Sequence, residues 1–266
     1  MSRWPKIRWL APLLLKRPEE FIDRLEAILD VQTDHRCVAT RTNYQFLQYD
    51  EAIQSFENAL DWDLHSYLNE SYLIGIERTI QENTALLTGK SPFLLTMNAD
   101  PSLAEFCYAV CRSLKPEVII ETGTAHGVTT SFILKALCVN QKGTLHSIDL
   151  PPLGNDADMF VGILVPEELR RRWRLHRGSS KRVLPKILSQ LDKVEVFVHD
   201  SLHTYRNVMR ELEMVFPLLA KPSVVLVDDV HLNSAFSDWV EKTVPSFWAI
   251  VREQDKNSAF GLAIFQ

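Results

Sequence analysis

Residues 118–130 read Val-Ile-Ile-Glu-Thr-Gly-Thr-Ala-His-Gly-Val-Thr-Thr, and this stretch decides the fold. Its short apolar opening predicts a buried strand, and residues 132–137 predict the helix that follows. Gly123 and Gly127 lie between them, where a backbone without Cβ atoms turns tightly and approaches a ligand closely. The first N–H groups of the helix are then available to an anion. The order of strand, glycine loop and helix predicts a site for a nucleotide-type ligand.

Further short apolar runs follow this stretch, and helix-like segments separate them. They lie at residues 144–148, 194–198 and 224–227. This alternation predicts a parallel sheet with helices on both faces. Residues 247–252 and 260–265 predict two closing strands that form a hairpin, with a turn near Lys256 and Asn257. The predicted fold class is therefore α/β, with a doubly wound, mostly parallel sheet.

The region before the sheet has a helical pattern. Pro18 suits a first helical position, and the apolar residues after it recur at helical spacing. Residues 50–87 continue this pattern, and the glycine and proline in residues 88–92 indicate a connection. We therefore predict two regions: a helical cap or oligomerisation region over residues 1–95, and the ligand-binding domain over residues 96–266.

The N-terminus combines basic and apolar residues. The apolar run Trp9–Leu15 is broken by Pro12 and followed by Lys16 and Arg17, which is not the pattern of a signal peptide. No apolar run reaches the ~18 residues of a membrane span, so we expect no transmembrane segment. We expect the run to be buried against the core. A weak peripheral membrane contact, or a contact with another subunit of a homo-oligomer, is the alternative, because tryptophan and basic residues stand together here.

The composition limits the partners of the chain. Its 266 residues carry a formal net charge of −5, with a pI near 5.9. This charge removes the attraction to nucleic acid, so a small-molecule partner is expected. Four cysteines in a chain of this length need no disulfides, which predicts reduced thiols and a cytoplasmic location. Cys107 and Cys111 share a helix face, but no second Cys or His pair completes a zinc site, so we expect them in the core.

The strand after the glycine loop ends at Asp149. An acidic side chain at such a strand end, about twenty residues beyond the glycines, accepts hydrogen bonds from the ribose hydroxyls of a bound nucleoside. A structural acid in a turn is the alternative. Neither the dinucleotide fingerprint G-x-G-x-x-G nor a Walker phosphate loop is present. The position of Asp149 therefore strengthens the signal that two glycines give alone.

The pattern Glu121-x-Gly123-x-x-x-Gly127-x-Thr129 resembles the first motif of class I S-adenosylmethionine (SAM) dependent methyltransferases, in the style of small-molecule O-methyltransferases. Residues 199–205, His-Asp-Ser-Leu-His-Thr-Tyr, are similar to a signature of the family related to cephalosporin-type and rhamnosyl O-methyltransferases. Residues 225–229 and 260–263 resemble the same family, so the resemblance extends over residues 101–266.

The resemblance implies a seven-stranded sheet of the Rossmann-like methyltransferase fold. It also implies that residues 96–266 form a methyltransferase domain with SAM as its cofactor. The cofactor-binding residues that it implies are Glu121, Thr122, Gly123, Thr124, Gly127, Thr129, Asp149, Ser179 and Asp200. The chain departs from the family at Ser201, where glycine is usual, and near the adenine, where Gly178-Ser179-Ser180 replaces Gly-Asp-Ser. The adenine contacts are therefore the part of the site that the resemblance supports least.

Three carboxylates are expected at one edge of the sheet. Asp200 ends one strand, and Asp228 and Asp229 end its neighbour. Mg²⁺ or another divalent cation takes such oxygen ligands, offsets their like charge and lowers the pKa of a bound hydroxyl. Metal-dependent relatives place ligands at equivalent strand ends. The alternative is that Asp228 caps a turn and Asp229 caps the next helix without a metal ion.

His203 lies three residues after Asp200, where either side chain could accept the proton of a substrate hydroxyl. The alternative is a histidine that bonds Asp200 or solvent. His231 is a second candidate, whereas His126, inside the glycine loop, is expected to shape the cofactor pocket. The arginine-rich run at 167–174 is expected on the solvated surface.

Together these features predict O-methylation of a hydroxyl on a small molecule, or on a sugar of a glycan or secondary metabolite. The oxygen attacks the sulfonium methyl group in line, while the protein supplies positioning and electrostatics. A nicotinamide-dependent oxidoreductase would share the ribose acid and the sheet, but it needs another glycine spacing. A non-catalytic SAM-binding protein is the remaining alternative.

Overall fold

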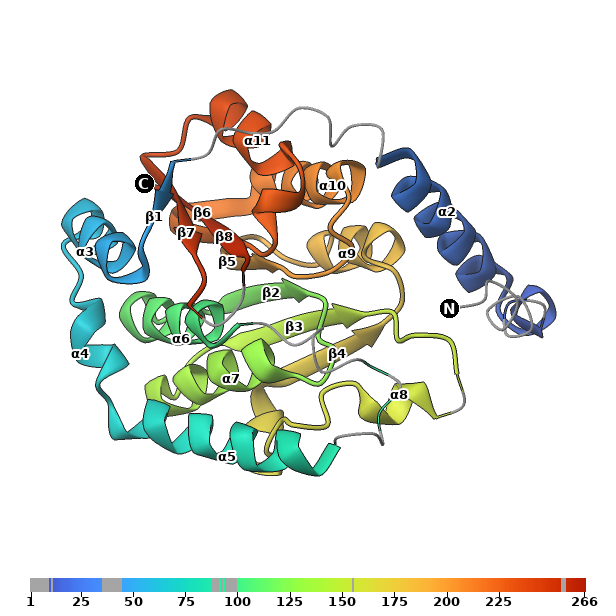
Figure 1. Ribbon diagram of the computed structural model, residues 1–266, viewed down its shortest axis with the longest axis horizontal. Helices are drawn as coiled ribbons and strands as arrows, with labels where there is room; N and C mark the ends of the chain where they lie inside the picture. The colour runs from blue at the N-terminus through green and yellow to red at the C-terminus, as the bar shows by residue number, and fades with distance from the viewer. Residues whose placement is uncertain are drawn as a thin grey trace.

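The computed structural model describes residues 10, 12–34, 45–87, 91, 93, 100–154, 156–254 and 257–266. They form an α/β fold with a central eight-stranded sheet and helices on both of its faces (Figure 1). The strand order is β1-β7-β8-β6-β5-β2-β3-β4. The strands are β1 (Phe46–Leu47), β2 (Val118–Thr122), β3 (Thr144–Asp149), β4 (Trp173–Arg177), β5 (Val194–His199), β6 (Leu219–Val227), β7 (Phe247–Arg252) and β8 (Ala259–Phe265).

Strand direction divides the sheet into two parts. Strands β2 to β6 pair in parallel, as does β1 with β7. Strand β8 runs antiparallel to both β6 and β7, so β7 and β8 form the predicted closing hairpin. Of the predicted turn between them, Lys256 lies outside the described residues. The predicted α/β class with a mostly parallel sheet is confirmed.

The helices enclose two hydrophobic clusters, one against each face of the sheet. The described helices are α2 (Pro18–Asp34), α3 (Tyr49–Leu60), α4 (Leu64–Leu68), α5 (Ser71–Leu87), α6 (Pro101–Leu114), α7 (Val128–Asn140), α8 (Ala157–Phe160), α9 (Ser180–Leu188), α10 (Tyr205–Val215) and α11 (Ala235–Thr243). Helices α3 to α7 contribute to the first cluster, and α9 to α11 contribute to the second. The core is therefore continuous from the N-terminal helices into the α/β region, and the predicted boundary after residue 95 stays a prediction.

The apolar runs are explained by burial of both strand faces. On β5, Val196 and Val198 belong to one cluster, whereas Phe197 belongs to the other. Successive side chains of a strand point to opposite faces, so a strand covered on both sides needs a continuous apolar run. The buried thiols of Cys107 and Cys111, on α6, confirm their predicted core position.

The expected seven strands and all-helical N-terminal region are corrected by β1 and β4. Strand β1 joins the outer edge of β7 although it lies within the region predicted to be helical. Strand β4 ends the sheet on the other side, and Arg174, predicted in a surface connection, lies on it. The remaining arginines of that run lie in a 3-10 helix over Glu167–Arg172. Edge strands are only partly covered, so they lack the apolar run that marks a central strand.

The expectation that the N-terminal apolar run is buried is wrong for most of its described residues. Leu10 is buried, but Leu14 and Leu15 are exposed. Trp4 and Trp9 lie outside the described residues.

The ends of β2 and β5 approach each other closely at Gly123. The amide of Asp200 donates to the carbonyl of Thr122 at 2.8 Å. A Cβ atom at Gly123, whose φ is +85°, would lie 1.8 Å from the backbone oxygen of Asp200. The chain's own packing therefore requires glycine here, and the same contact joins the glycine loop to the end of β5.

We predict that Gly123→Ala lowers the free energy of unfolding by about 2–4 kcal/mol, because the new Cβ meets backbone and strains a positive φ. Gly75→Ala is the control, since a Cβ there has no atom within 4 Å. Because Gly75 lies inside α5, the Gly75→Ala substitution should raise the free energy of unfolding by up to about 1 kcal/mol. Urea unfolding of both variants measures the effect, and equal stabilities would contradict the close approach.

Candidate active site

The glycine loop is held by a carboxylate from the neighbouring strand. Asp149, at the end of β3, accepts hydrogen bonds through Oδ2 from the amides of Thr124 at 2.8 Å and Ala125 at 2.9 Å. Burial raises the pKa of Asp149, although the two amides act against this shift. The other carboxylate oxygen of Asp149, Oδ1, takes no part in these two hydrogen bonds. The structure therefore places Asp149 directly beside the loop, at the position from which a ribose would be reached.

Two hydroxyl groups of the loop are buried without a hydrogen-bond partner in the described structure. They are Oγ1 of Thr124 and Oγ1 of Thr129. Helix α7 also begins at Gly127 without a side-chain cap. Its first N–H groups are consequently available to an anionic group. Unpartnered buried hydroxyls and an uncapped helix start fit a polar ligand that carries a carboxylate, such as the methionine part of SAM.

Glu121 points into the protein instead. Its Oε2 accepts hydrogen bonds from the hydroxyls of Thr130 at 2.7 Å and Ser147 at 2.6 Å. Burial raises the pKa of Glu121 to about 7, because these two bonds only partly offset the loss of water. In this arrangement Glu121 joins α7 to β2 and β3, and its predicted contact with the cofactor stays a prediction.

A second buried carboxylate, Glu211 of α10, lies behind the loop. Its Oε2 accepts from Thr122 Oγ1 at 2.5 Å and lies 2.7 Å from His199 Nδ1. Its Oε1 accepts from Ser201 and Asn207, each at 2.9 Å. Glu211 and His199 are both fully buried. This network, which the sequence did not reveal, fastens α10 to the ends of β2 and β5.

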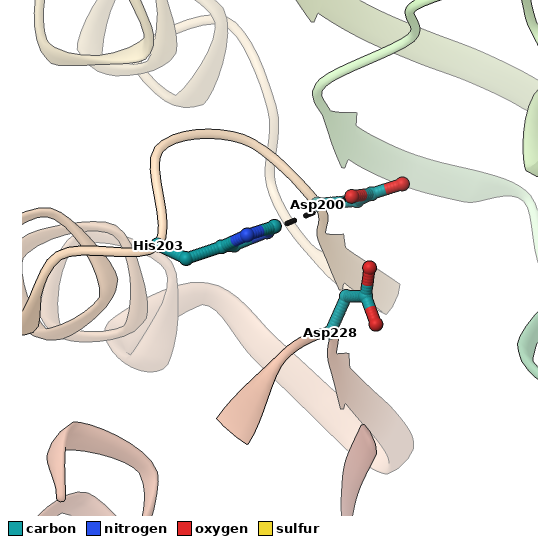
Figure 2. A group of neighbouring side chains, drawn as sticks. All are labelled: Asp200, His203 and Asp228. Carbon is teal, nitrogen blue, oxygen red and sulfur yellow. Dashed lines mark ion pairs between the residues drawn. The ribbon is translucent and has the colours of Figure 1, made fainter. Parts of the chain in front are cut away.

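The acid cluster lies where β5 and β6 end. Asp200, His203 and Asp228 each offer an atom within 4.8 Å of the others (Figure 2). His203 Nε2 lies 3.6 Å from Asp200, and its Nδ1 lies 3.0 Å from Asp229. Asp229 also accepts a bond from Ser258 at 2.5 Å. The structure thus brings His203 into the group with Asp200 and Asp228, whereas the role of Asp229 as a metal ligand stays a prediction.

The charges of the cluster depend on one another. Burial and the charge of Asp228 raise the pKa of Asp200 well above its ordinary value. Burial opposes a charged imidazole, but the contacts with Asp200 and Asp229 outweigh it and raise the pKa of His203 to about 10. His203 is therefore an imidazolium at neutral pH in this arrangement. The sequence predicted His203 as a proton acceptor but did not reveal its contact with Asp229.

The other histidine candidates lie apart from the Asp200–His203–Asp228 group. His231 Nδ1 is 3.8 Å from Oδ1 of Asp229, whereas His203 contacts Oδ2 of the same carboxylate. His126 lies in the glycine loop, where Nε2 is 2.7 Å from the hydroxyl of Ser91 and the ring packs on Phe93.

Helix α2 crosses the edge of the sheet that carries this site, on the side toward which β3 and β4 point (Figure 1). Asp23 accepts a hydrogen bond from Ser179 at 2.7 Å and pairs with Arg182. Glu20 pairs with Arg177, at the end of β4, at 2.7 Å. The hydroxyl of Ser179, predicted near the adenine, is therefore bonded to α2 in this structure.

Residues 120–230 match the model of a methyltransferase domain. This stretch begins in β2, contains the glycine loop and Asp149, and ends just after the acid cluster. The chain therefore contains a methyltransferase domain over these residues. No curated protein sequence matches it.

Solved structures share the fold of this methyltransferase. It is similar to an O-methyltransferase from Bacillus cereus in complex with SAH, with 14% identity, a TM-score of 0.57, and coverage of 81% of this chain and 97% of that one. It is also similar to TomG from Streptomyces achromogenes, an O-methyltransferase involved in tomaymycin synthesis and solved with SAM. Here the identity is 14% and the TM-score is 0.54, with coverage of 81% of this chain and 96% of that one. For the SAH-bound methyltransferase PaMTH1 of Podospora anserina, the identity is 10% and the TM-score is 0.50, with coverage of 84% of this chain and 99% of that one. Among the described residues of this methyltransferase, none of the helices has the length and apolar character needed to cross a membrane.

We predict that Glu211→Gln destabilises the methyltransferase by about 3–5 kcal/mol at pH 7, because it breaks a buried charged network. The pKa of Glu211 is lowered from 4.5 to about 2: burial raises it, but His199 and the hydroxyl groups lower it more. A lowered folded-state pKa gives stability that is present above pH 4.5 and lost as the pH falls through 2.

Urea unfolding at pH 7 and pH 3 tests this pH dependence. The difference in the free energy of unfolding between wild type and Glu211→Gln should be smaller at pH 3. Glu213→Gln is the control on the same helix, where the carboxylate is exposed and pairs with Lys242. Its effect should stay below about 0.5 kcal/mol. A Glu211→Gln deficit that is the same at both pH values would contradict the charged network.

Proposed function

We propose that this methyltransferase transfers the methyl group of SAM to a hydroxyl oxygen of a small molecule, or of a sugar in a glycan or secondary metabolite. One observation carries the proposal: the glycine loop touches the acid cluster. Gly123 lies against the backbone of Asp200, and the side chain of Asp200 lies within the group that includes His203 and Asp228. A cofactor in the loop would therefore present its methyl group beside groups that bind and deprotonate a hydroxyl.

The proposed cofactor site uses the free groups of the loop. The carboxylate of SAM would lie at the start of α7, near the hydroxyls of Thr124 and Thr129. The free oxygen of Asp149 would accept from the ribose. The match to the methyltransferase domain and the neighbours solved with SAM or SAH support this placement. Their low sequence identities leave the acceptor as our proposal.

The donor set of the acid cluster fits a divalent cation. Two carboxylates and one imidazole suit ions such as Mn²⁺, Fe²⁺ or Zn²⁺, and carboxylates alone suit Mg²⁺. The proposed holders are Asp200 and Asp228 with His203, and Asp229 would orient the imidazole from its other nitrogen. A bound cation would lower the pKa of the acceptor hydroxyl.

The chain's own residues would move the proton. The raised pKa of Asp200 makes its carboxylate a better proton acceptor near neutral pH. His203 is the other candidate, but it must first lose the proton that Asp200 and Asp229 stabilise. After deprotonation, the acceptor oxygen forms a bond to the methyl carbon as the carbon–sulfur bond breaks, leaving S-adenosylhomocysteine.

Two other functions are distinguished by binding and turnover. A nicotinamide-dependent oxidoreductase would bind NAD at the loop, although its glycine fingerprint is absent. A SAM-binding protein without activity would bind the cofactor but release no S-adenosylhomocysteine with any acceptor.

We predict that Asp149→Ala weakens SAM binding by roughly 1–3 kcal/mol, since it leaves the ribose hydroxyls without their acceptor. Isothermal titration calorimetry measures this change. Asp192→Ala is the control, because Asp192 lies just before β5, at the opposite edge of the sheet from the glycine loop. Unchanged SAM affinity of Asp149→Ala would exclude its ribose role, and saturable NAD binding without SAM binding would contradict the cofactor.

We predict that loss of the proton acceptor lowers kcat by a factor of about 10² to 10⁴. His203→Ala and Asp200→Asn identify which residue has this role. His65→Ala, an exposed histidine of α4, is the control. Steady-state kinetics with a panel of hydroxylated acceptors supplies the measurement.

A chelator then separates the cation from the base. If a cation assists, excess chelator suppresses turnover while calorimetry shows unchanged SAM affinity. Full activity in chelator would remove the cation from the proposal. Full activity of both His203→Ala and Asp200→Asn would exclude the acid cluster as the reaction site.

A further inference from the structure

Helix α2 has its apolar side chains in solvent and its charged side chains against the protein, the reverse of an ordinary surface helix. Leu29 is 58% exposed, whereas Asp23 is 7% exposed. The helical turn before α2 continues the exposed apolar surface, where Leu15 is 89% exposed. We define the apolar α2 face as Leu14, Leu15, Ile22, Leu25, Ile28 and Leu29.

The helical period explains how both faces coexist. Ile22, Leu25 and Leu29 follow one another at spacings of three and four residues, so they form one stripe along the helix. Glu20 and Asp23 lie on the opposite side, where they contact the α/β region. The orientation of α2 is thus set by its charges.

Every acidic residue of α2 has a polar partner on the rest of the protein. The partners are Arg182 for Glu19 and Asp23, Arg177 for Glu20, Lys181 for Glu26, Arg206 for Asp30, and the amide of Tyr205 for Asp34. The outward stripe of the helix is left apolar and without a free negative charge.

Basic residues precede this face in the sequence. The first 17 residues contain five basic residues and no acidic one, whereas the whole chain carries a net charge of −5. Of these basic residues, Lys16 and Arg17 lie in the described structure and are exposed, directly before α2. In the described structure the apolar face therefore adjoins two exposed basic residues, of which Arg17 also pairs with Glu20 and Lys16 is offered to a partner.

We propose that the apolar α2 face docks on a lipid surface with anionic headgroups. An amphipathic helix buries its apolar stripe at the boundary of headgroups and acyl chains, while neighbouring lysine and arginine residues attract anionic lipids. A second copy of the chain complements this surface less well, because its own α2 stripe offers no free carboxylate to the basic residues. Docking in this way brings the edge of the sheet that carries the active site close to the lipid.

Vesicle co-sedimentation of the full-length protein tests the proposal. Vesicles of phosphatidylcholine with phosphatidylglycerol should bind the protein, binding should weaken at high salt, and phosphatidylcholine alone should bind it less. Replacing Leu25 and Leu29 together by serine should weaken binding by at least about tenfold, because each buried leucine contributes substantially. Lys16→Gln should weaken it by about fivefold.

The matched control removes two exposed apolar side chains elsewhere, by replacing Ile74 and Leu86 of α5 with serine. Its vesicle binding should equal that of wild type. Circular dichroism melting establishes whether each variant is folded. If the Leu25 and Leu29 variant is not folded, the vesicle binding of Lys16→Gln and the comparison of the two vesicle compositions test the proposal. Equal binding to both compositions, or no binding by the wild type, overturns the proposal. If the wild type is a dimer that does not bind vesicles, and the Leu25 and Leu29 variant is a monomer, the face belongs to an interface with a second copy instead.

Discussion

The carboxylate of Glu211 holds together the part of the fold on which the active site depends. It is fully buried, and the polar groups around it come from β2, β5, the loop after β5 and α10. A buried charge is tolerated only when such partners replace its water. By satisfying them all, Glu211 fixes the carboxyl ends of two central strands relative to each other. The contact of Gly123 with Asp200 follows, and with it the proximity of the glycine loop and the acid cluster.

The acid cluster illustrates how proximity changes chemistry. Asp200 and Asp228 end neighbouring strands, so burial and the charge of Asp228 raise the pKa of Asp200. His203 relieves this conflict by lying between Asp200 and Asp229, and it becomes strongly basic as a result. An acidic pair with the basic His203 beside it is suited to exchange a proton for a cation or for an acceptor hydroxyl.

Helix α2 shows a different physical solution from the rest of the molecule. Helices α6 and α10 bury apolar side chains against the sheet. Helix α2 instead attaches through ion pairs, which leave its apolar stripe outside. Salt screens the exposed pair of Lys181 with Glu26, whereas it screens the pairs of the buried carboxylates of Glu20 and Asp23 less. Helix α2 also covers Ser179, at the edge where we place the adenine.

The sequence by itself determined the central sheet, the glycine loop and the acidic strand ends, because continuous apolar runs and glycine spacing are local signals. It gave α2 its start at Pro18 for the same reason. Only the tertiary structure decided that β1 and β4 extend the sheet, since edge strands lack a complete apolar pattern. It also decided that α2 faces inward with its acids and that His203 lies between two carboxylates. These features depend on partners such as Arg177 and Asp229 that are distant in sequence, and no local pattern encodes which charges meet.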